Sequence, residues 1–330
     1  AFNEWSGRAH FEAVARAYGI WPRCCLIYKQ GEQTHGMTFS EALCVANQAD
    51  LIITRSGQIH KLPELFEAPK ARAFFDGNPG STQIQFHQKT DGYEPLDQYE
   101  YLFTLGFNIG KEDCSIPTDG LNWRPMPRPV LLPMWPAATN PQCPNFTTIS
   151  TWKGRAKFAW QGIDSGEKSD NWLQFIGLPN KSNQALEIAL RIDSADAEGE
   201  RRMFEEQGWI ISDPRRLNSF EDYRDFIGQS RAEFSVAHNR YVEFNTGWFS
   251  DRSALYLASG KPVLVQSTGI EGYLPTGKGL LTYSTQAEAL AAIESINADY
   301  LGHCRAAREI AEQYFNADRI LPAIIEQIFN

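Results

Sequence analysis

One stretch of the chain constrains its possible folds more than any other: GWFSDRSALYLASGKPVLVQSTG, residues 247–269. Its polar start predicts a helix that begins near Ser250, where serine and aspartate side chains can accept the free N–H groups of a first turn. Gly260 is typical of a helix end, and Pro262 prevents the helix from continuing. The apolar residues 263–265 then form a short buried strand. This order is half of an α/β repeat, and sheets of such repeats hold phosphates and sugars at the helix start and after the strand.

The same alternation of short apolar runs and helical patterns extends along the chain. In the first half we expect strands at 24–28, 51–54, 71–75 and 101–105, with helices at 9–20 and 39–48. In the second half we expect strands at 146–151, 173–176, 209–212, 234–237 and 279–283, with helices at 220–229, 286–296, 299–314 and 318–328. Residues 184–192 fit a helix or a strand. Such alternation builds parallel sheets covered by helices.

A proline-rich segment divides the two halves. Residues 117–144 contain eight prolines, a density that excludes helices and central strands. We therefore expect an N-terminal Rossmann-like domain at 1–143, a second domain at 144–315 and a C-terminal helix at 316–330 that packs back on the first domain. The chain opens with a helical pattern, so we also expect a first strand to precede Ala1. The predicted fold is α/β, with two facing doubly wound domains and a cleft between them as the default ligand site.

Composition narrows the function classes. The net charge of −9 and the pI near 5.3 argue against nucleic acid as the main partner, because phosphate backbones are held by basic surfaces. The sequence lacks an apolar run of the roughly 20 residues that a membrane helix needs, so we expect no integral membrane segment. The six cysteines show no CxxC pair and no regular spacing, which is typical of reduced thiols in a cytoplasmic protein.

The second half resembles the C-terminal domain of GT-B-fold, nucleotide-sugar-dependent glycosyltransferases of the group-1 type. The likeness is carried by ALYLASGKPVLVQSTG (254–269), GYLPTGKGLLTYST (272–285) and the helical residues 287–296, and it extends to the closing helices. The paired glutamates that the group usually carries are absent, because Gly247 and Leu255 occupy their places.

The resemblance implies a glycosyltransferase that takes a sugar from an NDP-sugar, such as a UDP-sugar, and gives it to an acceptor hydroxyl. The second domain would bind the donor and the first domain the acceptor. We expect no cofactor and no metal, so that protein cations and a helix dipole would stabilise the leaving diphosphate. A nucleotide-sugar epimerase of the same architecture and a non-catalytic sugar-nucleotide-binding protein remain alternatives.

The donor site is expected at the ends of the second domain's strands. The resemblance places the diphosphate beside basic residues in WKGRAK (152–157), which could instead be a solvated loop. Residues after the strand at 234–237 and in QSTGIEGY (266–273) could bind the base, the sugar or the phosphates, or be structural. At the helix near Ser250, the alternatives are donor binding and simple capping. The predicted donor-binding residues are Lys153, Arg155, His238, Asn239, Ser250, Asp251, Arg252, Thr268 and Gly269.

A catalytic base is expected in the first domain, where an inverting transferase would activate the acceptor hydroxyl. Asp76 is the first candidate, because it ends a buried strand in FFDGNPGSTQ. Its alternative role is an Asx-turn that bonds its own backbone. Glu32 and His35, in the loop QGEQTHG, are the second candidates.

Overall fold

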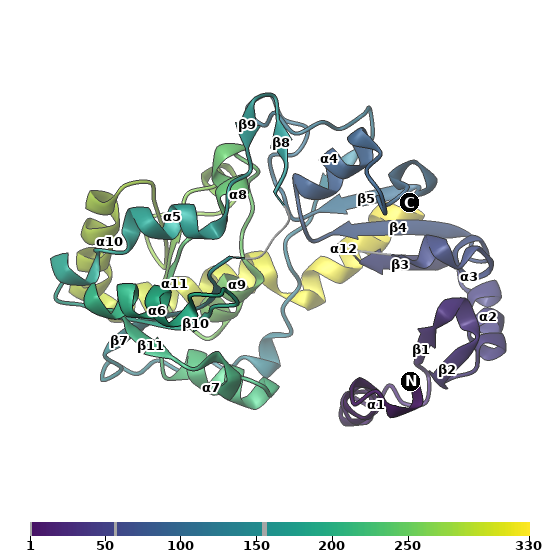
Figure 1. Ribbon diagram of the computed structural model, residues 1–330, viewed down its shortest axis with the longest axis horizontal. Coiled ribbons are helices and arrows are strands. Elements are labelled where there is room, and N and C mark those ends of the chain that lie inside the picture. The colour runs from purple at the N-terminus through teal and green to yellow at the C-terminus, as the bar shows by residue number, and fades with distance from the viewer. Residues whose placement is uncertain (1, 56–57, 154–156) are drawn as a thin grey trace. The chain divides into compact units, whose positions relative to one another are not determined.

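The computed structural model of the chain describes residues 2–55, 58–153 and 157–330 (Figure 1). The chain divides into two compact units. The first comprises Ala1–Asn78, Gln85–Thr104 and Thr118–Arg124, and the second comprises Pro79–Ile84, Leu105–Pro117 and Pro125–Asn330. Two short segments from the first half of the chain, as well as most of the proline-rich segment, therefore belong with the second half.

The first unit contains a four-stranded sheet and a separate hairpin. Its elements are α1 (Gly7–Ala17), β1 (Cys25–Tyr28), β2 (Gln33–Gly36), α2 (Phe39–Gln48), β3 (Leu51–Arg55), α3 (Pro63–Glu67), β4 (Ala71–Asp76), β5 (Tyr101–Thr104) and β6 (Trp123–Pro125), with α4 (Ser81–Gln88) spanning both units. The sheet has the order β3-β4-β5-β6, and β4 is parallel to both β3 and β5. Helix α2 begins at a capping box between Thr38 and Glu41.

The strand expected at 24–28 is present as β1, but it is not part of a parallel sheet. It pairs antiparallel with β2, and Cys25 lies opposite Gly36. The polar residues QGEQTHG thus form the turn and second strand of a hairpin instead of a loop at the edge of a parallel sheet. The short apolar run identified the strand and could not identify its partner.

The second unit is a doubly wound α/β domain. Its elements are β7 (Asn145–Thr151), β8 (Ala159–Trp160), β9 (Ile163–Asp164), α5 (Lys168–Phe175), β10 (Ala185–Arg191), α6 (Ala197–Glu206), β11 (Ile210–Ser212), α7 (Phe220–Gly228), β12 (Ala232–Ser235), α8 (Asn239–Glu243), α9 (Asp251–Ala258), β13 (Val263–Gln266), β14 (Leu280–Tyr283), α10 (Gln286–Ala298), α11 (Tyr300–Ile310) and α12 (Ala317–Phe329). The parallel sheet has the order β11-β10-β7-β12-β13-β14. This order is the Rossmann arrangement, numbered from β7 as its first strand.

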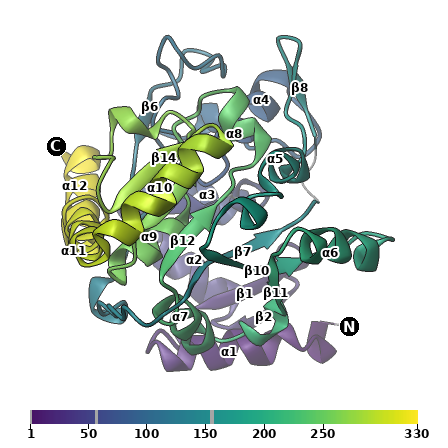
Figure 2. The same ribbon diagram turned by 90° about the vertical axis from the view of Figure 1, so that its left-hand side faces the viewer.

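Two apolar cores lie on the two faces of this sheet. One core joins Trp172 of α5, Phe204 of α6 and Ile293 of α10 to the strands. The other joins Ile227 of α7 and Tyr256 of α9 to the opposite face, together with residues of α11. The two helical layers and the sheet between them can be followed in Figure 2. None of the helices in the described ranges combines the length and apolarity that a membrane span requires.

Two expectations for the second unit are decided by its packing. Residues 173–175 of the expected strand 173–176 belong to helix α5, which begins at a capping box between Glu167 and Asp170, and Ile176 is its C-cap. Trp172 and Phe175, three residues apart, lie in the core, whereas Leu173 is exposed, as expected for the two faces of a helix. The ambiguous residues 184–192 contain strand β10, in which Leu186, Ile188, Ala189 and Leu190 are buried between the two helical layers.

Candidate functional site

The sheet of the second unit changes its direction of growth between β7 and β12. From β7 the chain adds β10 and β11 on one side, and β12, β13 and β14 then follow on the other side. The ladder between β7 and β12 consists of two residue pairs, Ala232 with Phe146 and Glu233 with Thr147. Beyond these pairs the two strands are not joined, and open α/β sheets bind ligands at such a switch point.

Helix α9 begins beside this switch point without a side-chain cap. Ser250 occupies the N-cap position as predicted, but its side chain makes no capping hydrogen bond. Asp251 follows as the first helical residue and is exposed. The N–H groups of a first turn form the positive end of the helix dipole and bind anions. Simple capping by Ser250 is therefore not what this geometry shows, whereas a hydroxyl contact by Asp251 stays a prediction.

A small buried hollow lies at the start of α9. Its lining includes Ser235, Trp248, Ser250, Ser253, Gln266 and Thr268. Ser253 is 0% exposed, and its hydroxyl has no hydrogen-bond partner within the described part of the chain. Leaving a buried hydroxyl unpaired costs about 1–3 kcal/mol. The hollow has a volume of about 10 Å³, which is enough for one water molecule, so the hydroxyl of Ser253 needs either a water there or a shift at the start of α9 to reach a ligand.

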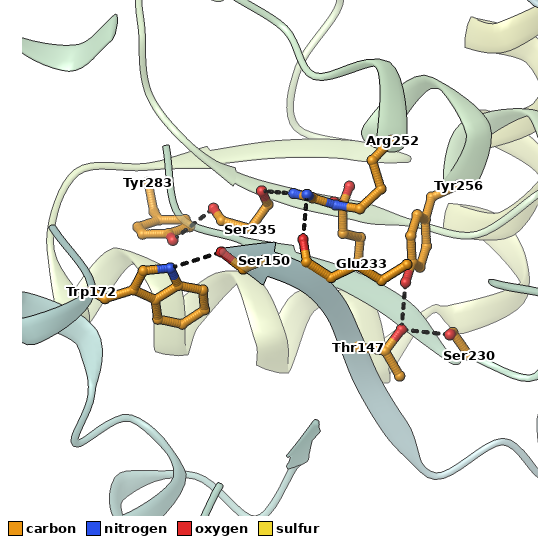
Figure 3. Close-up of polar contacts among 10 residues, drawn as sticks. Thr147, Ser150, Trp172, Ser230, Glu233, Ser235, Arg252, Tyr256 and Tyr283 are labelled. Carbon is orange, nitrogen blue, oxygen red and sulfur yellow. Dashed lines mark hydrogen bonds and ion pairs between the residues drawn. The ribbon is translucent and has the colours of Figure 1, made fainter. Parts of the chain in front are cut away.

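Arg252 was predicted to contact the diphosphate, and in the structure its guanidinium bonds groups of its own unit. Its guanidinium donates from Nε to Glu233 Oε1 (2.6 Å), from Nη1 to the carbonyl of Ile149 (2.6 Å) and from Nη2 to Ser235 Oγ (2.5 Å). Figure 3 shows the side chain pointing from α9 into the sheet toward Glu233 and Ser235. All three nitrogens are engaged inside the unit, so Arg252 is part of the support of the site.

Lys153 follows β7 and lies at the end of the sheet where the resemblance placed it. Its ammonium lies 2.5 Å from Glu200 Oε1 on α6, and this hydrogen bond raises the pKa of Lys153 above its ordinary value. The Lys153 side chain is 46% exposed. An exposed ion pair is worth about 0–1 kcal/mol, so a diphosphate could take the place of Glu200. Arg155, predicted alongside Lys153, lies outside the described residues.

His238 comes three residues after β12 and caps the short helix α8. Its ring nitrogen Nδ1 accepts from the backbone N–H of Arg240 at 3.4 Å. The ring is buried, with 6% exposed. The buried guanidinium of Arg240 bonds Ser81 and lies 5.1 Å from the ring centroid of Phe158. Asn239, the first residue of α8, is half-buried and its binding role stays a prediction.

Thr268 and Gly269 hold the loop after β13 against other loops of the unit. The Thr268 hydroxyl donates to the carbonyl of Trp248 at 2.7 Å. Gly269 has φ +85°, and a Cβ there would lie 2.1 Å from Asn245 Oδ1, so only glycine fits. The carbonyl of Gly269 accepts from Nδ2 of Asn108, a buried residue that the sequence analysis missed. Sequence separation hid Asn108, because it precedes the loop it fixes by about half the chain.

The first-choice catalytic base, Asp76, has an internal structural role. It is 1% exposed at the end of β4. Oδ1 accepts from the backbone N–H of Asn78 at 2.8 Å, and Oδ2 accepts from the hydroxyl of Thr104 at 2.8 Å. This geometry matches the Asx-turn alternative for the sequence DGNPG.

The second-choice residues belong to the hairpin of the first unit. His35 lies on β2, where Nε2 is 3.0 Å from Glu12 Oε2 and Nδ1 is 3.0 Å from Arg8 Nη2, both on α1. Glu32 is an exposed residue of the turn. Glu32 and His35 therefore lie in an antiparallel hairpin, and their role as a catalytic base stays a prediction. His35 ties the hairpin to helix α1.

A larger hollow lies at the carboxyl ends of β10 and β11. Its lining includes Arg191, Asp193, Arg201, Asp213 and Arg215. Arg215 donates to both oxygens of Asp213 and lowers the pKa of that carboxyl to about 2. The hollow is open and lined by charged side chains. It lies on the same edge of the sheet as the start of α9, because both are at the carboxyl ends of parallel strands.

The sequence matches no known family model and no curated protein. Solved structures, by contrast, share its architecture. Sucrose-phosphate synthase from Thermosynechococcus elongatus aligns with a TM-score of 0.56 at 12% identity, over 91% of this chain and 82% of the other. HepE from Anabaena, solved with UDP and glucose, aligns with a TM-score of 0.55 at 12% identity, over 88% of this chain and 80% of the other. An α-glucosyltransferase solved with UDP aligns with a TM-score of 0.55 at 10% identity, over 88% of this chain and 84% of the other. The chain has the GT-B fold of two Rossmann-like units, which confirms the predicted fold class.

Proposed function

We propose that the protein is a glycosyltransferase that moves a sugar from an NDP-sugar to an acceptor hydroxyl. The observation that carries the proposal is the start of α9. There, the N–H groups of the uncapped first turn lie beside the switch point of a Rossmann sheet, and the unpartnered hydroxyl of Ser253 faces a small hollow lined by residues of β12, β13 and the start of α9. Fixed donors of this kind stabilise the charge that develops on a departing diphosphate.

The donor would extend along the carboxyl edge of the sheet. The diphosphate lies at the first turn of α9, with Lys153 exchanging Glu200 for a phosphate oxygen. The nucleoside lies toward the hollow at β10 and β11. HepE and the α-glucosyltransferase were each solved with UDP, so UDP is the first nucleotide to test. Transfer without a metal is part of the proposal.

A non-catalytic sugar-nucleotide-binding protein is the second candidate function. It is favoured by one observation, which is that the proposed bases Asp76 and His35 both bond to residues of their own unit. The two functions share the donor site and differ in turnover.

The test is a thermal-shift panel of UDP, GDP, TDP, ADP and CMP, with and without Mg²⁺, followed by an assay of UDP release from UDP-glucose in the presence of a mixed saccharide acceptor. A diphosphate at 100 times its Kd should stabilise the protein by about 2.7 kcal/mol. Binding with acceptor-dependent release supports the transferase. Binding without release supports the second candidate, and the absence of any nucleotide shift contradicts both. A shift that requires Mg²⁺ contradicts metal independence.

A further inference from the structure

The switch-point crevice has an internal support at its base. Strands β7 and β12 stop pairing after Thr147 and Glu233, so the carbonyl of Ile149, two residues further along β7, has no partner on β12. That carbonyl accepts from Nη1 of Arg252. The guanidinium therefore stands where the next rung of the ladder would be.

The same guanidinium also bonds two residues of β12. Glu233 and Ser235 are two positions apart, so their side chains share the face of the sheet that α9 covers. Figure 3 shows both side chains directed toward the Arg252 guanidinium. One residue in the first turn of α9 thus connects the helix to both strands that border the crevice.

The positive charge of Arg252 and the negative charge of Glu233 neutralise each other inside the second unit. Glu233 is 0% exposed, and Oε2 has no hydrogen-bond partner in the described ranges, so its Coulombic partner is Arg252. Burial works to lower the pKa of Arg252, but the carboxylate of Glu233 outweighs it and raises the pKa, so the guanidinium stays charged. Solvent does not screen this pair as it screens a surface ion pair.

A second polar contact fixes α9 one turn later. The hydroxyl of Tyr256 lies 2.6 Å from Oγ1 of Thr147, and Thr147 also bonds Ser230 (Figure 3). Helix α9 is therefore attached to β7 at two residues. Arg252 bonds Ile149, beyond the last pair of β7 and β12, and Tyr256 bonds Thr147, which belongs to that pair. The attachment made by Arg252 is the one next to the proposed diphosphate position.

We propose that Arg252 and Glu233 form a positioning pair that holds the crevice between β7 and β12 open and fixes the start of α9 at its edge. The pair acts on the donor through α9, since neither side chain is available to the ligand itself. This inference rests on the proposed function for its ligand, but its structural content concerns the two strands and the helix. A misplacement of about 1 Å at such a site can cost as much as about 100-fold in rate or affinity.

The experiment replaces the pair without leaving a buried charge. The double variant Arg252→Met/Glu233→Leu substitutes apolar side chains of similar size, and such replacements often leave a fold equally stable or more stable. Arg252→Lys keeps the charge but loses the planar fork that reaches three partners. The matched control is Arg308→Met, because Arg308 bonds Glu312 and the carbonyls of Trp135 and Ala258 at the other end of α9.

Three quantities are measured for each variant: the melting temperature, the Kd for UDP and the hydrogen exchange of amides 254–257 in α9. For the double variant we expect a melting temperature within about 3 °C of the wild type. We also expect a UDP Kd that is raised about 10- to 100-fold, with faster exchange in α9. Arg252→Lys should weaken UDP binding in the same direction. Arg308→Met should lower the melting temperature and leave the UDP Kd within about twofold.

Native UDP affinity and native exchange in the double variant would overturn the inference and leave the pair as a stabilising contact only. If the double variant does not fold, Arg252→Lys takes its place, and native UDP affinity and native exchange in that variant would overturn the inference. If the wild type binds none of the nucleotides, the proposed function fails. Hydrogen exchange still tests the positioning of α9 in that case, so the two failures are distinguishable.

Discussion

The two ends of helix α9 each bury a cation, and the protein treats the two cations differently. Arg252, in the first turn, has a carboxylate, a carbonyl and a hydroxyl as partners. Lys261, three residues after the last turn, is 0% exposed, and its Nζ has no hydrogen-bond partner in the described part of the chain. Burial lowers the pKa of Lys261, only partly offset by Cys143 and Cys304.

The difference shows that burial of a charged group does not by itself mark a site. Lys261 lies near the thiols of Cys143 and Cys304, and its burial without a hydrogen bond is a cost of packing. Arg252 stands where two strands part, next to an unpartnered hydroxyl and an uncapped helix start. The start of α9, where we propose that the donor binds, therefore differs from the other end by the polar groups arranged around it.

The strongest way to test the comparison is to remove the partner of Arg252. Glu233→Leu leaves the guanidinium buried without its carboxylate, and we expect a loss of about 3–5 kcal/mol in the free energy of unfolding. Urea unfolding measures this loss, and the double variant with Arg252→Met should recover most of it. A loss under about 1 kcal/mol would show that water reaches the pair.

The opposite result is expected at the other end of α9. Lys261→Met should stabilise the protein by about 1–3 kcal/mol at pH 7, because it removes a buried amine without a hydrogen bond. Urea unfolding at several pH values checks this, and a destabilised variant would mean that the amine has a partner.

The gain should shrink as the pH rises. The folded-state pKa of Lys261 is below its ordinary value of 10.5, so between the two values the unfolded chain binds more protons than the folded chain. Native stability therefore increases with pH across that window, and the advantage of Lys261→Met declines toward pH 10.5. A gain that is constant with pH would contradict this cause.

Ser253→Ala tests the open end of α9 through binding. We expect the UDP Kd to rise about tenfold, since a hydrogen bond to a charged group is worth about 1.5–3 kcal/mol. The free energy of unfolding should rise by about 1–3 kcal/mol, because the variant removes a buried hydroxyl without a partner. The matched control is Ser259→Ala at the C-terminal end of α9, and calorimetry measures the UDP Kd of both variants. Equal effects of the two variants on the UDP Kd would remove Ser253 from the site.

The smallest expected effect is at Gly260. This residue has φ +67°, and an added Cβ would meet nothing closer than 3.5 Å, so Gly260→Ala introduces backbone strain without a clash. We expect a loss of about 1 kcal/mol in urea unfolding and an unchanged UDP Kd. Gly272→Ala is the control, because it has open space and no positive φ. A changed UDP Kd in Gly260→Ala would mean that the two ends of α9 are coupled.

Local sequence signals predicted most elements of the second unit. Helix α9 begins and ends where Ser250 and Gly260 placed it, and β13 follows directly. The failures were short apolar segments, such as residues 173–176, where the same composition serves a buried strand or a buried helix face. Only the neighbours that cover such a segment decide between them.

The candidate site was predicted less well than the fold. The start of α9 and the loop at Gly269 lie at the predicted edge of the sheet, because the ends of parallel strands share one edge. The direction of each side chain was not predictable. Arg252 bonds inward to Glu233, and Asp76 bonds to Thr104.

The sequence by itself determined the α/β class, the helix-turn-strand unit at residues 247–269 and the edge of the sheet where a ligand would bind. These follow from periodicity, caps and turns, which are properties of residues close together in the chain. Only the tertiary structure decided that Arg252 supports the crevice, that Ser253 is unpartnered and that His35 belongs to a hairpin. Each depends on groups brought together by packing, and a hydrogen bond between Arg252 and Ile149 spans a separation that no local pattern records.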